Sequence, residues 1–94
     1  MRIKWTRKAL ANLQAELAYI AQDDLQAARL VAQRIERAVA RLEQQPSLGR
    51  SGRVPGTREL VVTKTRYILP FRVKRGQIEI LRVFHTDRPW PDQL

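Results

Sequence analysis

Cysteine is absent from this chain of 94 residues, so no disulfide can form and no thiol can act as a nucleophile or metal ligand. Histidine occurs only once, as His85, which leaves no Cys/His cluster with metal-binding spacing. No apolar run approaches the roughly 20 residues of a membrane span, and the opening MRIKWTRKAL lacks the apolar stretch of a signal peptide. The sequence therefore predicts a cytoplasmic protein with no metal ion, no cofactor and no membrane partner.

Acidic residues are also scarce: nine of them stand against eighteen basic ones and leave a net charge of +9. Fourteen of the basic residues are arginine, whose planar fork suits carboxylates and phosphates. Residues 50–88 carry most of the excess, with ten basic and three acidic side chains. Because a chain this short builds a thin core, a bound partner would add stability. The charge indicates that this partner is a nucleic acid, an acidic protein or an anionic lipid.

The first quarter of the chain is predicted to form a strand and a helix. Residues 2–5, RIKW, alternate in hydropathy and indicate a short strand. Thr6 is a suitable N-cap for a helix over residues 7–22. The apolar side chains predicted to share one face of this helix are Leu10, Leu13, Leu17 and Ile20.

A second helix is predicted over residues 25–45, where apolar side chains again recur at helical spacing. Asp23, with Gln26 three residues later, matches the pattern of a capping box at its start. Pro46 ends the helix, since proline cannot continue it. The link between the two helices is only two or three residues long, so we expect an antiparallel helical hairpin.

The second half of the chain is predicted to form a loop and three strands. Pro70 cannot donate to a strand ladder, so we expect a bulge or an unpaired edge there. Gly76 allows a tight turn between the second and third of these strands. The loop covers residues 46–57, and the strands cover residues 58–64, 66–74 and 77–85.

Taken in order, these elements predict one α+β domain over residues 1–94 with the sequence β-α-α-β-β-β. The three consecutive strands should form an antiparallel meander, and the helical hairpin should pack on one of its faces. Alternation in the last strand predicts that Ile78, Ile80 and Phe84 point to the same face. The first strand should join an edge of the sheet, and the pattern leaves open which edge.

Three segments carry a resemblance to a known family: RVPGTRELV (53–61), YILPFRV (67–73) and IEILRVFHTDRPWP (78–91). Together with the order of elements, they resemble the RelE/ParE superfamily of bacterial type II toxins over nearly the whole chain. The resemblance implies a helical hairpin on an antiparallel sheet. It also implies an antitoxin that reads operator DNA through its own N-terminal domain and wraps the toxin with its C-terminal tail. Contact with operator DNA would then occur only through the antitoxin.

The superfamily divides into RelE-like ribosome-dependent endoribonucleases and ParE-like inhibitors of DNA gyrase. RelE-like proteins resemble one another in an arginine that opens an Arg-Leu-Val-Tyr motif, whereas Ile68 stands at that place here. Lys64 is the only lysine on the preceding strand, and no tyrosine follows Tyr67. The ending RVFHTDR is similar to the histidine-then-arginine ending of ParE-like chains. We therefore interpret the chain as a ParE-like gyrase inhibitor without enzymatic activity of its own; the alternatives are a RelE-like mRNA interferase and a plain nucleic-acid-binding module.

Several side chains are candidates for contact with the target or with an acidic antitoxin tail. His85 is the one acid/base candidate, although a strand-end histidine bound to the backbone fits as well. The loop arginines and the strand arginines could form basic contact patches or solvated faces. In the last segment, the guanidinium of Arg88 and the ring of Trp90, which stands between two prolines, favour an exposed contact surface. The predicted contact residues are Arg50, Arg53, Arg58, Arg66, Arg72, His85, Arg88 and Trp90. The arginines of the second helix could form a solvated face or pair with an acidic antitoxin helix.

Overall fold

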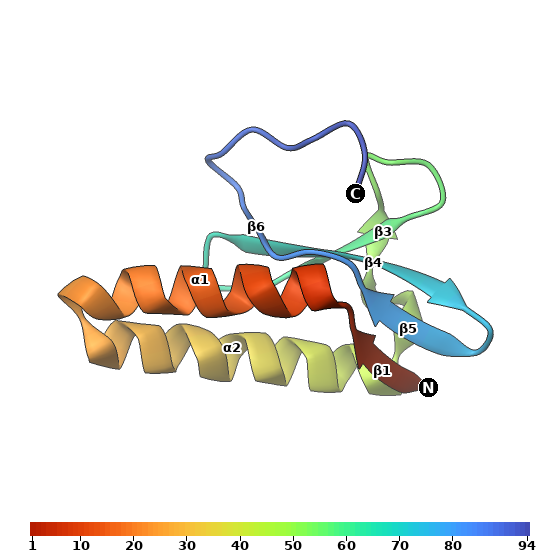
Figure 1. Cartoon of the computed structure of the whole chain (residues 1–94). Coiled ribbons are helices and arrows are strands. Elements are labelled where there is room, and N and C mark those ends of the chain that lie inside the picture. The colour runs from red at the N-terminus through yellow and green to blue at the C-terminus, as the bar shows by residue number, and fades with distance from the viewer.

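Two helices lie on one face of a sheet, and the C-terminal segment crosses the opposite face (Figure 1). This is the arrangement in a computed structural model that describes residues 1–94. The strand order is β1-β5-β4-β3-β2, with β6 also paired to β4. The elements are β1 (Arg2–Trp5), α1 (Arg7–Asp23), α2 (Leu25–Gln44), the 3-10 helix η1 (Pro46–Leu48), β2 (Arg50–Ser51), β3 (Arg58–Val61), β4 (Tyr67–Lys74), β5 (Gln77–Ile80) and β6 (Phe84–His85).

Capping side chains fix where both helices begin. Thr6 caps α1 as predicted, since its hydroxyl accepts the N–H of Ala9 at 3.1 Å. The predicted cap of α2 was wrong by one residue, because the carboxylate of Asp24, not that of Asp23, accepts the N–H of Ala27 at 3.1 Å. Asp24 has the extended backbone that a cap requires, whereas Asp23 is still helical. This single extended residue between the helices folds them into the predicted antiparallel hairpin (Figure 1).

The sheet is mixed, because a parallel strand joins the predicted antiparallel meander. Strands β3, β4 and β5 pair in succession as antiparallel neighbours. Strand β1 adds to the outer edge of β5 in parallel, with Ile3 opposite Ile78. Parallel strands cannot be joined by a tight turn. The chain leaves β1 through the helical hairpin and returns across the sheet through β2, β3 and β4 to β5. The β4–β5 turn has positive φ at Arg75 (52°) and Gly76 (75°), the conformation that two-residue hairpin turns favour.

The predicted strand over residues 77–85 is interrupted by a bulge. Phe71 of β4 pairs with Ile80 of β5, but Ile68 pairs with Phe84 of β6. Three residues of the interrupted strand therefore lie opposite two residues of β4, which confirms the expected bulge. Pro70, which has no N–H to donate, lies at this position, and its carbonyl accepts the N–H of Leu81 at 2.8 Å. The extra residue reverses the side-chain alternation, so the prediction that Phe84 shares a face with Ile80 was wrong.

The core lies between the helices and one face of the sheet. Phe71 is a fully buried member of this core, and the partly buried Trp5 packs against the core. Gly49 approaches the Phe71 ring so closely that an added Cβ atom would collide with it. Leu10 is exposed, so the predicted apolar face of α1 was wrong at that position. The buried cluster consists of Ala9, Ile35, Val39, Leu42, Leu60, Val62, Tyr67, Leu69, Phe71, Ile78, Ile80 and Val83. Neither helix is apolar enough over a sufficient length to cross a bilayer.

Candidate functional site

Residues 86–94, here called the C-terminal strap, run across the sheet face that the helices leave uncovered (Figure 1). The bulge turns Phe84 toward this face, where its ring contacts Trp90 with centroids 4.7 Å apart. Ile68 and Pro70 are buried although neither belongs to the core cluster between the sheet and the helices. The strap therefore closes a second, smaller apolar layer on the outer face.

One end of the strap is fastened to α1 by an ion pair. The guanidinium of Arg88 donates to both oxygens of Glu16, at 2.5 and 2.9 Å. The Tyr67 hydroxyl donates to the same carboxylate at 3.0 Å. Burial alone would raise the pKa of Glu16, but the hydrogen bonds from Arg88 and Tyr67 outweigh it and hold this pKa below its ordinary value of 4.5. Burial and the hydrogen bond to Glu16 raise the pKa of Tyr67 to about 12.

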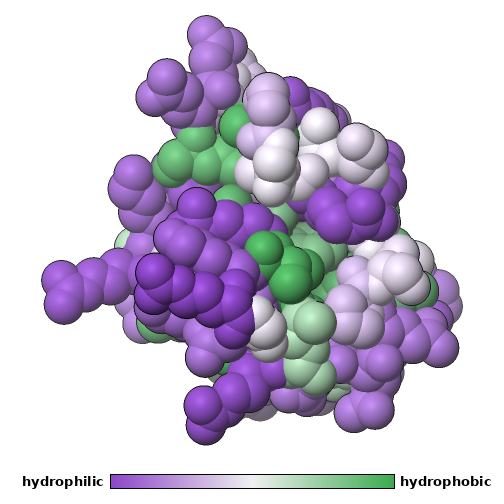
Figure 2. Space-filling view, turned by 90° about the vertical axis from the view of Figure 1, so that its right-hand side faces the viewer, coloured by the Kyte–Doolittle hydropathy of each residue, from purple (hydrophilic) through white to green (hydrophobic).

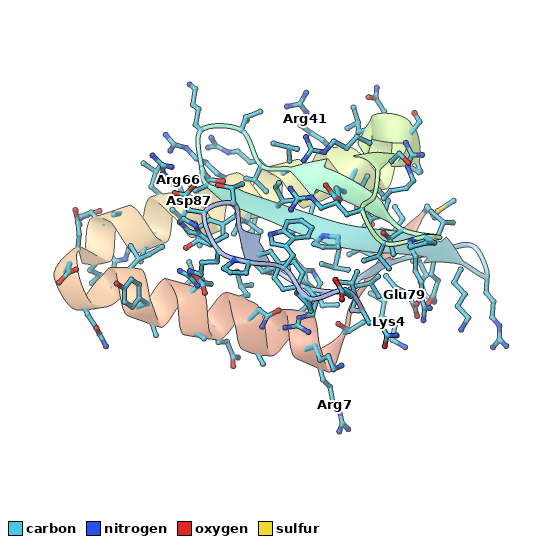
Figure 3. All side chains as sticks on the ribbon, turned by 90° about the horizontal axis from the view of Figure 1, so that it is seen from above. Lys4, Arg7, Arg41, Arg66, Glu79 and Asp87 are labelled. Atoms are coloured by element: carbon cyan, nitrogen blue, oxygen red, sulfur yellow. The ribbon has the colours of Figure 1, made fainter.

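His85 adopts the strand-end arrangement, with a backbone hydrogen bond. Its Nδ1 accepts the N–H of Asp87 at 3.1 Å, so the neutral ring carries its proton on Nε2. The ring meets Tyr67 edge-on, with centroids 5.4 Å apart. Asp87 in turn accepts a hydrogen bond from Arg66 at 2.8 Å, an exposed pair visible at one end of the sheet (Figure 3). Within this group the acid/base side chains of Glu16 and Tyr67 are bound to each other, and neither donates to or accepts from His85.

The other anchor of the strap is a buried acid that the sequence reading did not single out. Glu59 is 2% exposed and accepts two hydrogen bonds from Arg50, at 3.1 and 3.2 Å. It also accepts the backbone N–H of Arg53 at 2.9 Å. The Arg53 guanidinium lies over the Trp90 ring, 3.8 Å from its centroid, a cation–π contact. The signal in the sequence was a lone acid among arginines, because Glu59 is the one acidic residue between Arg50 and Arg66.

A groove of about 510 Å³, here called the α2 groove, lies between α2 and β3. Its apolar wall includes Leu30, Leu48 and Val61, whose side chains are 42–44% exposed. Arg34 spans the groove from α2 and donates to the carbonyl of Lys64 at 2.9 Å. The apolar lining residues are Leu30, Ala38, Leu48, Leu60 and Val61, and the basic ones are Arg34, Arg37, Arg41, Arg50 and Lys64. Three of the four arginines of α2, namely Arg34, Arg37 and Arg41, thus border an apolar groove and do not form a purely solvated face.

The eight predicted contact residues are spread over several places. His85, Arg66 and Arg88 lie around Tyr67 and α1, whereas Arg53 and Trp90 meet at the other anchor of the strap. Arg50 borders both that anchor and the α2 groove.

The two remaining predicted residues have partners of their own. Arg58 donates to the carbonyl of Gly49 within the loop. Arg72 pairs with Glu79 at 2.6 Å on the outer face of the sheet. No group of three His, Cys, Asp or Glu side chains is close enough together to hold a metal ion.

Comparison with known proteins agrees with this architecture. Residues 3–90 match the family model described as the ParE toxin of the type II toxin–antitoxin system parDE. The chain is 46% identical over 93 residues to "Putative toxin Y4kP" of Sinorhizobium fredii, covering 99% of this chain and 96% of that protein. It is 36% identical over 87 residues to "Toxin RelE2" of Caulobacter vibrioides, covering 93% and 97%.

The structure is also similar to a solved one, a chain of the "Chromosomal ParDE TA system from P. aeruginosa". The TM-score is 0.82 and the sequence identity 37%, over 93% of this chain and 97% of that one. The family model and this structure both name ParE or ParDE, and both relatives are named as toxins. The chain belongs to the ParE family of type II toxin–antitoxin toxins.

Proposed function

We propose that this toxin inhibits DNA gyrase in the cytoplasm by binding, without cutting a nucleic acid. The observation that carries the proposal is the internal pairing of the polar cluster around His85. Metal-free RNA cleavage needs a base, an acid and a cation directed at the substrate. Here Arg88 and Tyr67 both donate to Glu16, and the Nδ1 of His85 is bound to the backbone. Membership of the ParE family supports the same conclusion.

The toxin is neutralised, in this proposal, by an antitoxin segment that binds the α2 groove. An apolar wall bordered by cations suits a helix or extended chain with apolar residues on one side and Asp or Glu beside them. Arg37 and Arg41 supply exposed charges at the rim, and Arg41 projects away from the body of the molecule (Figure 3). Recognition of operator DNA is left to the antitoxin.

The target can be identified in cells and with purified components. Induction of the toxin should raise the SOS response, and the purified chain should inhibit supercoiling by gyrase. If induction instead stops translation with cut mRNA and no SOS response, the chain is a RelE-like mRNA interferase and the gyrase proposal is wrong.

The groove can be tested with the antitoxin encoded beside the toxin gene. Leu48→Glu places a charge on the apolar wall and should weaken antitoxin binding at least tenfold in a calorimetric titration, with gyrase inhibition retained. Leu25→Glu is the matched control, because Leu25, at the start of α2, is 55% exposed and does not line the groove. Equal binding by the Leu48→Glu variant and the unchanged chain would show that the antitoxin binds elsewhere.

A further inference from the structure

The outer face of the sheet carries a second basic surface beyond the strap. Residue pairing places Lys4 of β1, Glu79 of β5 and Arg72 of β4 in one row across three strands. The next row contains Arg2, Gln77 and Lys74. Figure 3 shows Lys4 and Glu79 side by side at this end of the sheet. Together with Arg75 in the turn, these residues are here called the basic sheet face.

The charge of this face is strongly one-sided. All five of its cations are exposed, and Glu79 is its one acid, so its net charge is +4. Glu79 accepts a hydrogen bond from Arg72 at 2.6 Å, and this bond lowers the pKa of Glu79, whereas burial acts to raise it. The charges of Arg72, Lys4 and Lys74 act in the same direction. The Glu79 carboxylate is therefore ionised and paired with Arg72. The four other cations of the face are not paired with it and can attract an anionic ligand.

This face offers positive charge to an anionic ligand, but its two rows have no apolar side chain that could anchor a protein partner. Strand alternation sends Ile3, Trp5 and Ile78 to the core side, so the two rows contain only charged and amide side chains. Figure 2 views this end of the molecule: hydrophilic side chains project around its outline, and apolar side chains lie nearer its centre. Stable protein partners usually need an apolar centre, which the α2 groove has and this face lacks. Phosphate groups, in contrast, can be bound by cationic side chains alone.

The shape of the face favours a duplex over a single strand. Single strands are bound mainly by stacking of bases on aromatic side chains, and these rows have no aromatic residue. Neighbouring strands lie about 4.8 Å apart and alternate residues of one strand about 6.8 Å apart. The cations therefore cover roughly 10 by 7 Å, similar to the 6–12 Å widths of the grooves between the phosphate strands of B-DNA.

We propose that the basic sheet face binds the phosphate backbone of double-stranded DNA directly and without regard to sequence. This is an interaction of the toxin alone, separate from operator recognition by the antitoxin. It does not depend on gyrase being the target, because it can be measured with the toxin and DNA as the only components. In a complex with any DNA-bound target, it would hold the toxin against the duplex beside the target protein.

The test compares two charge-matched triple variants of the full chain. The first changes Arg2, Lys4 and Lys74 to glutamine, and the control changes Arg29, Arg37 and Arg41 on α2 to glutamine. None of these six side chains forms an ion pair or a side-chain hydrogen bond, and each set lowers the net charge from +9 to +6. Binding to a fluorescent 20-base-pair duplex is followed by polarisation between 50 and 200 mM salt.

We expect the unchanged chain to bind with a steep salt dependence, since each phosphate contact contributes a slope of about −0.9 in log K against log salt. The sheet-face triple should lose about 2.5 of that slope and at least tenfold in affinity at 100 mM salt, whereas the α2 triple should keep the slope. Equal losses in both triples would mean that only net charge matters. Failure of the unchanged chain to bind the duplex, or tighter binding to a single strand or to phosphatidylglycerol vesicles, would also overturn the proposal.

Discussion

Arg88→Ala should destabilise the fold, because the change removes both hydrogen bonds that fasten the C-terminal strap to Glu16. A hydrogen bond to a charged group contributes about 1.5–3 kcal/mol. The Arg88 side chain is 50% exposed and that of Glu16 16%, so solvent screening reduces the pair to roughly 1 kcal/mol. In a domain of this size, a loss of about 1 kcal/mol lowers the melting temperature by roughly 4–8 °C.

A double-mutant cycle isolates this pair from other effects of the substitutions. Urea unfolding of the unchanged chain, Arg88→Ala, Glu16→Gln and the double variant should give a coupling energy of about 0.5–1 kcal/mol. Arg66→Ala is the control next to the strap, because Arg66 and its partner Asp87 are 69% and 60% exposed. We expect that control to change the free energy of unfolding by less than about 0.5 kcal/mol.

The same pair should make stability depend on pH. The pKa of Glu16 is lower in the folded chain than in the unfolded chain, so the pair stabilises the fold above the ordinary value of 4.5. This contribution is lost as the pH falls through the folded pKa. The stability difference between the unchanged chain and Arg88→Ala should therefore be constant near neutral pH and disappear in strong acid. A coupling energy of zero at pH 7, or a coupling that persists at about pH 2, would refute the assignment.

Three further substitutions test other features. His85→Gln should leave most of the toxicity in a folded chain, because inhibition by binding needs no proton transfer. In an mRNA interferase the loss of a general acid or base would cost typically 10²–10⁴-fold in rate, so near-complete loss together with mRNA cleavage by the parent would favour the interferase. Gly49→Ala should destabilise by about 1–3 kcal/mol, since its methyl group would meet the Phe71 ring; an unchanged melting temperature would contradict that contact. Glu59→Gln should lower the free energy of unfolding in urea by about 2 kcal/mol, because the uncharged amide loses the charge-assisted hydrogen bonds to the loop. An unchanged free energy of unfolding would show that these bonds do not stabilise the loop.

Patterns that lie within one element predicted most of the fold. Helical periodicity and a threonine cap located α1, and proline with glycine marked the turns. Two adjacent acids, Asp23 and Asp24, could each have capped α2, and only the backbone geometry distinguishes them. Pro70 predicted a bulge, but not that the extra residue would lie in the third predicted strand, opposite Pro70, and turn Phe84 to the outer face. A strand that reads as continuous gives no sign of where its alternation reverses.

The candidate surfaces were less predictable, because their contacts join residues far apart in the chain. Glu16 and Arg88 are 72 positions apart, so no spacing indicates their pairing. The sequence identified the arginines but not the acids that hold them. The parallel pairing of β1 with β5 was also hidden, since parallel neighbours share no turn. That one pairing decides which cations gather on the basic sheet face.

The position of β1 has a consequence for how the toxin is made. The first strand pairs with residues 77–80, so its pairing in the sheet cannot form until residue 80 has been synthesised. The strap, which covers the outer face, is synthesised after all the strands of the sheet. Such long-range pairing slows folding and delays it until late in synthesis. A nascent chain in which β5 has not yet been made would therefore lack the strand to which β1 pairs, and with it the complete basic sheet face.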